Sequence, residues 1–127
     1  MAKLIFNYQF MKSEYFLDKD TITVGRIESN DISIPSYEIF KKLPIETQKG
    51  LLNLLTKISR KHARIIYKNG TYFAEDLGTT GWGSTYGTYV SELRLEVKKP
   101  YPLKSEDKIR FGTVECIFLD EEEKKET

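Results

Sequence analysis

The sequence contains few of the residues from which metal, disulfide and membrane sites are built. Among its 127 residues there are one cysteine, Cys116, and one histidine, His62. One cysteine forms no internal disulfide, and one cysteine with one histidine cannot complete a structural zinc site. Apolar runs fall short of the roughly 18 residues of a membrane-spanning helix, and the N-terminus has too short an apolar stretch for a signal peptide. These absences predict a cytoplasmic protein without a metal, a cofactor or a membrane contact.

Charge and motifs also argue against nucleic-acid binding and catalysis. Lys and Arg number 20 and Asp and Glu 19, for a formal net charge of +1, so no basic excess points to nucleic acid. The segment that begins at Gly81 misses the last glycine of the dinucleotide-binding motif, and the chain has no Gly-Lys-Ser/Thr. Ser59 and His62 lie three residues apart at the start of an expected strand, so their side chains point to opposite faces. We therefore expect a protein that is not an enzyme.

Short β-strands are predicted along most of the chain. The β-prone runs lie at 3–8, 14–17, 21–24, 62–67, 71–75, 88–90, 93–97, 109–111 and 114–119. The pair Asn69-Gly70 between two of these runs is a strong hairpin signal, and Gly112-Thr113 separates the last two. Cys116 lies within the last run, where we expect a buried, unreactive thiol. Many short strands joined by turns predict an all-β sandwich or barrel.

One segment departs from the β pattern and predicts a helix at about 44–57. Its apolar residues follow helical spacing: Leu51, Leu54, Leu55 and Ile58. Pro44 suits a first helical turn, whereas Gly50 costs the helix about 1 kcal/mol. The apolar stripe has two interpretations. Either it packs on the sandwich as a small local core, or it forms a contact surface for a partner or a second copy of the chain.

Four separated motifs occur between the expected strands. They are Gly25-Arg26 with Asn30-Asp31-Ile32, then Ser59-Arg60-Lys61-His62, then Asp76-Leu77-Gly78 with the segment 83–90, and finally the segment 107–112. In this order they resemble the motifs of the forkhead-associated (FHA) domain family, over about residues 3–119. The resemblance implies an all-β fold, an FHA/SMAD-like β-sandwich of two antiparallel sheets and eleven strands. We expect the domain at residues 1–120, with a helical insertion at about 36–57 and a polar tail at 121–127.

The motif residues also suit a phosphate-binding site on chemical grounds. Phosphothreonine carries a charge close to −2 and three acceptor oxygens. A site for it needs a guanidinium group, hydroxyls and backbone N–H groups on loops that a rigid scaffold holds in place. The sequence places Arg26, Ser59-Arg60 and Ser84-Thr85 in three loops between expected strands.

The resemblance gives these residues their expected roles. Arg26 matches the arginine that binds phosphate, and Ser59 matches the serine whose hydroxyl and N–H hold it. Arg60 occupies a position that touches phosphate or peptide backbone, and Thr85 matches a threonine near the phosphothreonine. The full phosphopeptide-binding set is then Arg26, Ser59, Arg60, Ser84, Thr85 and Tyr86, with structural support from Gly25, His62 and Gly87.

The sequence departs from the family pattern within this site. Tyr86 stands where the family usually has asparagine, and a phenol lacks the paired donor and acceptor of an amide. About five extra residues lengthen the same loop and leave Trp82 at an exposed tip flanked by glycines. Two alignments of the loop are open: Ser84-Thr85-Tyr86-Gly87 fills the family's Ser-Thr-Asn-Gly, or Thr79-Thr80-Gly81 does.

The resemblance implies a signalling module that binds phosphothreonine in partner proteins phosphorylated by a Ser/Thr kinase. The helix at 44–57 would offer a further contact with a partner or a second copy. The alternative is a phosphate-independent interaction or scaffold domain on the same fold, which Tyr86 and the insertions make credible.

Overall fold

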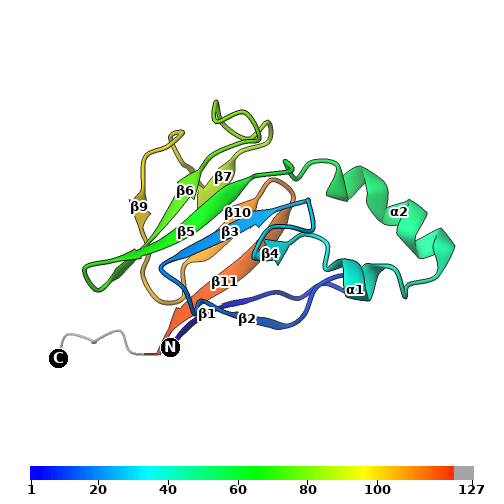
Figure 1. Ribbon diagram of the computed structural model, residues 1–127, viewed down its shortest axis with the longest axis horizontal. Helices are drawn as coiled ribbons and strands as arrows, with labels where there is room; N and C mark the ends of the chain where they lie inside the picture. Colours follow the sequence, from blue (N-terminus) through cyan, green and yellow to red (C-terminus); the bar gives the residue numbers. More distant parts are fainter. Residues whose placement is uncertain (122–127) are drawn as a thin grey trace.

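The computed structural model describes residues 1–121, which form eleven β-strands in two facing sheets (Figure 1). One sheet has the order β2-β1-β11-β10-β7-β8. Its strands are β1 (Ala2–Ile5), β2 (Glu14–Phe16), β7 (Thr88–Val90), β8 (Leu93–Arg94), β10 (Lys108–Phe111) and β11 (Val114–Asp120). The other sheet has the order β4-β3-β5-β6-β9. Its strands are β3 (Thr21–Gly25), β4 (Ile32–Ser33), β5 (Ala63–Lys68), β6 (Thr71–Asp76) and β9 (Tyr101–Pro102).

The predicted all-β sandwich is confirmed, and each predicted strand overlaps an observed one. The residue runs alone did not predict β4 and β9, which have two residues each and are too short to show an alternating pattern. The named strands pair in antiparallel fashion with one exception. Strand β4 runs parallel to β3, with Ile32 opposite Val24. The sheets are therefore mostly, not wholly, antiparallel.

The Asn69-Gly70 turn forms the predicted hairpin between β5 and β6. Lys68 pairs with Thr71 across it, and both turn residues have positive φ, 51° for Asn69 and 80° for Gly70. This is the turn in which Asn-Gly is favoured, because its backbone twist matches that of the strands on either side.

The core lies between the sheets and follows from the alternation of the strands. In β11, for example, Val114, Cys116 and Phe118 are buried while the residues between them are more exposed. Burial raises the pKa of the Cys116 thiol well above its ordinary value. The thiol therefore stays protonated and packs as a small apolar side chain, as the sequence predicted.

Two helices occupy the predicted insertion between β4 and β5. The longer one, α2 (Ile45–Leu55), confirms the helix expected at 44–57, and a single turn, α1 (Tyr37–Phe40), precedes it. Leu55 and Ile58 are buried, and Leu51 and Leu54 pack against the core. The apolar stripe is therefore covered by the sandwich, as in the first of the two interpretations.

The start of β1 and the end of β11 lie at a different end of the sandwich from the motif loops (Figure 1). The first and last strands pair from Ala2 opposite Asp120, whereas the loops that carry the motifs gather near the other end, beside α2. Apart from Glu121, the polar tail expected at 121–127 lies outside the described residues. Within residues 1–121, no helix combines the length and apolar character needed to cross a membrane.

Gly50 gives a direct test of the insertion helix. A methyl group at this position would meet no heavy atom within 4 Å. Because alanine is the better helix former, Gly50→Ala should raise the free energy of unfolding by about 0.5–1 kcal/mol in urea denaturation. Gly70→Ala is the matched control, since it also meets open space but at a φ of 80°, and should lower that free energy by about 1 kcal/mol. A Gly50→Ala protein no more stable than the parent would contradict a well-formed α2.

Candidate functional site

Three loops meet at the motif end of the sandwich. They are 26–31 between β3 and β4, 56–62 between α2 and β5, and 77–87 between β6 and β7. Hydrogen bonds between loops, rather than sheet pairing, hold them together. The site therefore depends on a small number of polar contacts.

His62 joins two of the loops. Its ring is fully buried, with Nδ1 accepting the Ser59 backbone N–H at 3.0 Å and Nε2 lying 2.9 Å from the Gly87 carbonyl. An amide N–H only donates and a carbonyl only accepts, so the ring must carry its proton on Nε2. With both nitrogens bound to backbone, the imidazole braces the loops and is not a base for the Ser59 hydroxyl.

Two glycines allow the backbone to approach closely around this histidine. Gly25 lies against Arg60, and a Cβ on it would fall 2.3 Å from the Arg60 carbonyl oxygen. Gly87 has a φ of 84°, which favours glycine. Its carbonyl also accepts the Gly112 N–H at 2.8 Å. The structure thus places Gly25, His62 and Gly87 at close backbone contacts between the loops.

Arg26 is anchored at three points. Its N–H donates to the Ser59 carbonyl at 3.0 Å, its Nε donates to the Ile58 carbonyl at 3.1 Å, and its own carbonyl accepts the Tyr37 hydroxyl at 2.6 Å. The Nε contact uses one guanidinium donor and leaves those of the two terminal nitrogens for a ligand. Because Ile58 follows α2 and Tyr37 lies in α1, the helical insertion itself helps to position this arginine.

Ser59 and Arg60 lie in the loop to which the Arg26 backbone is bonded, but the Ser59 backbone is already occupied. Its N–H is donated to His62, so only its hydroxyl remains for a ligand, and not the N–H that the family resemblance implied. Arg60 has an exposed side chain, and its carbonyl accepts the Asn30 amide Nδ2 at 2.9 Å. The same Asn30 nitrogen donates to Ile27, so Asn30 ties the first loop to the second.

Asp76 organises the third loop, which sequence reasoning did not anticipate. This buried carboxylate accepts the Ser84 N–H at 3.0 Å, the Ser84 hydroxyl at 2.6 Å and the Thr88 hydroxyl at 2.6 Å. The Ser84 side chain therefore turns inward, and the residue is only 5% exposed. The structure places Ser84 in a supporting position instead of at the ligand surface. In the sequence, the indication of its importance was its place at the start of the Asp76-Leu77-Gly78 motif.

Thr85 and Tyr86 are exposed on the third loop. Thr85 stands two residues before Gly87, whose carbonyl is bound by His62, and the Lys57 ammonium lies 5.9 Å from the Tyr86 ring centre. Thr79, which belongs to the alternative alignment, accepts the Lys61 N–H with its hydroxyl at 3.4 Å. Two contacts bring this part of the third loop to the loop at 56–62, namely that of His62 with Gly87 and that of Lys57 with Tyr86.

The loops carry more positive than negative charge, since their acidic residues are Glu28 and Asp31, and Asp31 pairs with Lys19. Four cations lie on them: Arg26, Lys57, Arg60 and Lys61. Among the side chains of residues 1–121, none of these four forms a salt bridge, although lysines and arginines elsewhere do. The arrangement suits an anionic ligand.

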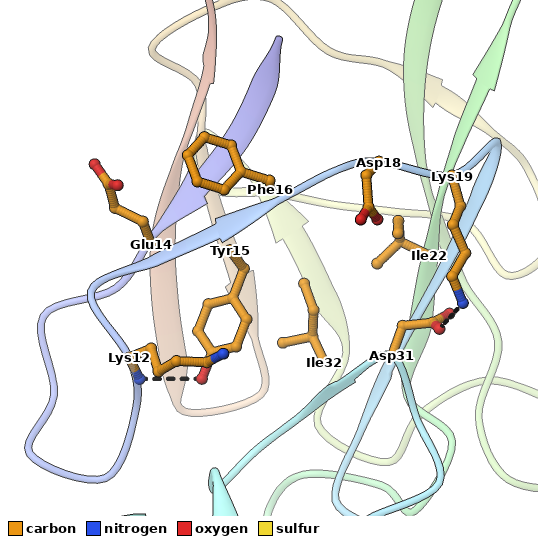
Figure 2. A pocket seen from close by; sticks show the side chains of 9 residues that line it. All are labelled: Lys12, Glu14, Tyr15, Phe16, Asp18, Lys19, Ile22, Asp31 and Ile32. Atoms are coloured by element: carbon orange, nitrogen blue, oxygen red, sulfur yellow. Dashed lines mark hydrogen bonds and ion pairs between the residues drawn. The ribbon is translucent and has the colours of Figure 1, made fainter.

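A separate pocket lies between the sheet edges at β2 and β3–β4 (Figure 2). Its volume is about 310 Å³, and its apolar wall includes Tyr15, Ile22 and Ile32. Lys19 pairs with Asp31 at its rim, and the Tyr15 hydroxyl accepts the Lys12 N–H at 3.0 Å. None of the predicted site residues lines it. No group of His, Cys, Asp or Glu among residues 1–121 is arranged to hold a metal ion.

The buried histidine predicts a pH dependence of stability. Burial lowers the pKa of His62 below its ordinary value of 6.5, against the opposing effects of Gly87 and Asp76. Below pH 6.5 the unfolded chain therefore binds a proton that the folded protein does not, and acidification destabilises the fold. We expect the free energy of unfolding to fall between pH 7 and pH 5, by at most about 1.4 kcal/mol per pH unit. His62→Gln should be less stable at pH 7, but its free energy of unfolding should no longer fall in this way with pH. Denaturation at several pH values measures this dependence. An unchanged dependence on pH in the variant would contradict its assignment to His62.

A family model with the description FHA domain matches residues 22–112. Curated relatives include a probable E3 ubiquitin-protein ligase dma1 of Schizosaccharomyces pombe, 36% identical over 59 residues. This match covers 43% of the chain and 20% of the relative. A protein phosphatase 1 regulatory inhibitor subunit homologue of Arabidopsis thaliana is 36% identical over 63 residues, which cover 49% of the chain and 16% of that protein. The chain thus spans only a small part of the curated relatives it matches.

Solved structures share the fold over nearly the whole chain. An FHA domain of a Chlamydia trachomatis protein superposes with a TM-score of 0.65 at 23% identity, covering 94% of this chain and 96% of that one. The N-terminal FHA domain of Saccharomyces cerevisiae Rad53p, in complex with a phosphothreonine peptide, gives a TM-score of 0.66 at 15% identity, with coverage of 93% and 91%. Together with the family match over residues 22–112, these findings show that the chain belongs to the FHA domain family.

Proposed function

We propose that this chain is a phosphothreonine-dependent protein-binding module and not a catalyst. The observation that carries the proposal is the anchored Arg26. Its Nε is fixed to the Ile58 carbonyl, and its backbone is bonded to Ser59 in the neighbouring loop. It therefore presents its terminal nitrogens beside the Ser59 hydroxyl and Arg60, with no acidic partner among the described side chains. Solved members of the family that bind phosphothreonine peptides support the same function.

The donors at this site fit a phosphate dianion. A phosphothreonine offers three acceptor oxygens to a guanidinium and hydroxyls. Each hydrogen bond to a charged group contributes roughly 1.5–3 kcal/mol. Two or three such bonds total roughly 3–9 kcal/mol before the entropy of association is subtracted. Micromolar affinity, about −8 kcal/mol, therefore also requires contacts with the peptide beside the phosphate.

Each site residue receives a specific role in this proposal. Arg26 and Arg60 bind the phosphate, and the Ser59 and Thr85 hydroxyls donate to the phosphate or to the adjacent peptide. Tyr86, exposed beside Lys57, contacts the peptide through its ring. Ser84 acts indirectly, since its bonds to Asp76 set the path of the loop. Residues 1–120 form the proposed binding unit, because β1 and β11 pair along their length.

The partner is then a protein phosphorylated by a Ser/Thr kinase. Since such kinases use the ATP of the cell interior, the proposal places the domain in the cytoplasm. Within residues 1–121, no cluster of metal-ligating side chains accompanies the site, and both nitrogens of the single histidine bind backbone groups. The site chemistry thus favours recognition over turnover.

A matched pair of peptides tests the proposal. A phosphothreonine peptide should bind in calorimetry, and its unphosphorylated twin should not. Arg26→Ala should weaken phosphopeptide binding by roughly 2–4 kcal/mol, because it removes a charged fork that faces a dianion. The control is Lys68→Ala at the β5–β6 hairpin, a cation at the far end of β5, which should leave binding unchanged. Equal affinity for the two peptides would instead support the phosphate-independent alternative.

A pair of threonine variants tests the alignment of the third loop. Thr85→Ala should weaken phosphopeptide binding by roughly 1 kcal/mol, the usual contribution of one hydrogen bond. Thr80→Ala, on the same loop, should have no effect. If only Thr80→Ala weakens binding, the site lies on the earlier threonines and the role given to Thr85 is wrong.

A further inference from the structure

Strand β2 (Glu14–Phe16) lies at one edge of the six-stranded sheet, where β1 is its only neighbour among the described strands. It is the longest of the strands at edges within residues 1–121, since β4, β8 and β9 have two residues each. Strand β2 also borders the open pocket between it and β3–β4 (Figure 2). An uncovered edge of this kind can pair with a further strand.

The pairing of β2 with β1 shows which of its backbone groups point to the edge. The Ser13 carbonyl accepts an N–H at 3.0 Å and the Leu17 N–H donates at 2.9 Å, both with the first segment, residues 2–6. In an antiparallel pair, every second residue turns both its N–H and its C=O to the same neighbour. Every second residue from Ser13 to Leu17 therefore faces β1. Glu14 and Phe16 consequently present their N–H and C=O groups at the edge of the sheet.

Charged side chains flank this edge in a self-complementary order. Lys12 precedes β2 and Asp18 follows it, each three residues from Tyr15 at the centre of the strand. Both side chains line the pocket, toward opposite ends of β2 (Figure 2). Neither forms a salt bridge among the side chains of residues 1–121. A strand that pairs antiparallel with β2 around Tyr15 therefore meets a cation at one end and an anion at the other.

We propose that β2 pairs with β2 of a second copy of this chain about a twofold axis at Tyr15. Antiparallel pairing about this axis sets Lys12 opposite Asp18 of the second copy, and the reverse, so an ion pair forms at each end. Glu14 of each copy then lies opposite Phe16 of the other, and their outward groups exchange N–H···O=C bonds. The segment is complementary to itself in both backbone and charge, which selects a second copy over an unrelated strand.

This pairing leaves the motif loops free. Because the two β2 strands run in opposite directions, the motif loops of the two copies lie at opposite ends of the joined sheet. None of the predicted phosphopeptide-binding residues lies on β2 or within the segment 12–18. The inference therefore does not rest on the proposed function, and its tests need no phosphopeptide.

Charge reversal tests the ion pairs in sedimentation equilibrium, at protein concentrations from about 10 μM to about 1 mM. The parent should form dimers in this range. Lys12→Asp and Asp18→Lys should each weaken the dimer by about tenfold, because each variant sets like charges opposite each other at both ends. Lys99→Asp is the matched control, a reversal of an exposed cation between β8 and β9, and should dimerise as the parent does.

A mixture of the two charge variants gives the sharpest result. A heterodimer of Lys12→Asp with Asp18→Lys again has opposite charges at both ends of the paired strands. The equimolar mixture should therefore form dimers within about threefold of the parental affinity, although neither variant does so alone. A loss of folding in either variant cannot produce this recovery.

A second pair of variants separates the backbone of β2 from its side chains. Phe16→Pro removes the outward N–H, which β1 does not bind, and proline is tolerated at such positions of an edge strand. Phe16→Ala removes the same ring but keeps the N–H. Phe16→Pro should dimerise about tenfold more weakly than Phe16→Ala, because each dimer loses two hydrogen bonds. Both variants should remain folded in urea denaturation.

Three results would overturn the inference and leave the proposed function intact. The first is a parent protein that stays monomeric up to about 1 mM, which would leave the edge to a strand of another protein. The second is a mixture of the charge variants that associates no more tightly than either variant alone. The third is an equal affinity of the folded Phe16→Pro and Phe16→Ala proteins for themselves, which would exclude the backbone of β2 from the contact.

Discussion

The site depends on one buried imidazole. His62 connects the backbone N–H of Ser59 to the carbonyl of Gly87 and thereby fixes the distance between two loops that no strand pairing connects. The ring packs edge-on against Phe111, with ring centres 6.0 Å apart, so its position is set by the core. The Ser59 N–H can only donate and the Gly87 carbonyl can only accept, so the ring remains neutral with its proton on Nε2. Loss of this bridge would leave the Ser59 N–H without its partner and would remove one of the two hydrogen bonds to the Gly87 carbonyl, which is costly in a fold of this size.

Arg26 adds the β3–β4 loop to this arrangement, and Asp76 shapes the β6–β7 loop that His62 already holds. Arg26 attaches the β3–β4 loop to the carbonyls of Ile58 and Ser59, and Asp76 gathers Ser84 and Thr88 at the base of the β6–β7 loop. The polar groups in these contacts are largely buried, and they make their hydrogen bonds within the protein. The groups left over, chiefly guanidinium nitrogens and hydroxyls, are those that an anionic ligand requires. Rigid placement of a few free donors makes phosphate recognition specific.

The sequence predicts the fold more completely than the site. Alternation, the Asn69-Gly70 turn and the order of the motifs were enough to predict the sandwich and the loops that carry Arg26, Ser59 and Arg60. They did not predict the direction of individual hydrogen bonds, which decides whether a polar residue faces a ligand or the scaffold. Ser84 turned inward to Asp76, and the Ser59 N–H turned to His62, for reasons that only three-dimensional contacts reveal. Composition likewise gave no sign that the insertion contributes Tyr37 to the placement of Arg26.

The central claim is that the loops joined by His62 form one binding surface for a phosphorylated peptide. Its most direct measurement is a ¹H–¹⁵N correlation spectrum of the labelled protein titrated with a phosphothreonine peptide and with its unphosphorylated twin. The account predicts that amides at 26, 59–60 and 84–88 shift together, with a single dissociation constant, and only with the phosphorylated peptide. Shifts confined to the pocket between β2 and β3–β4, or shifts that are the same for both peptides, would contradict it.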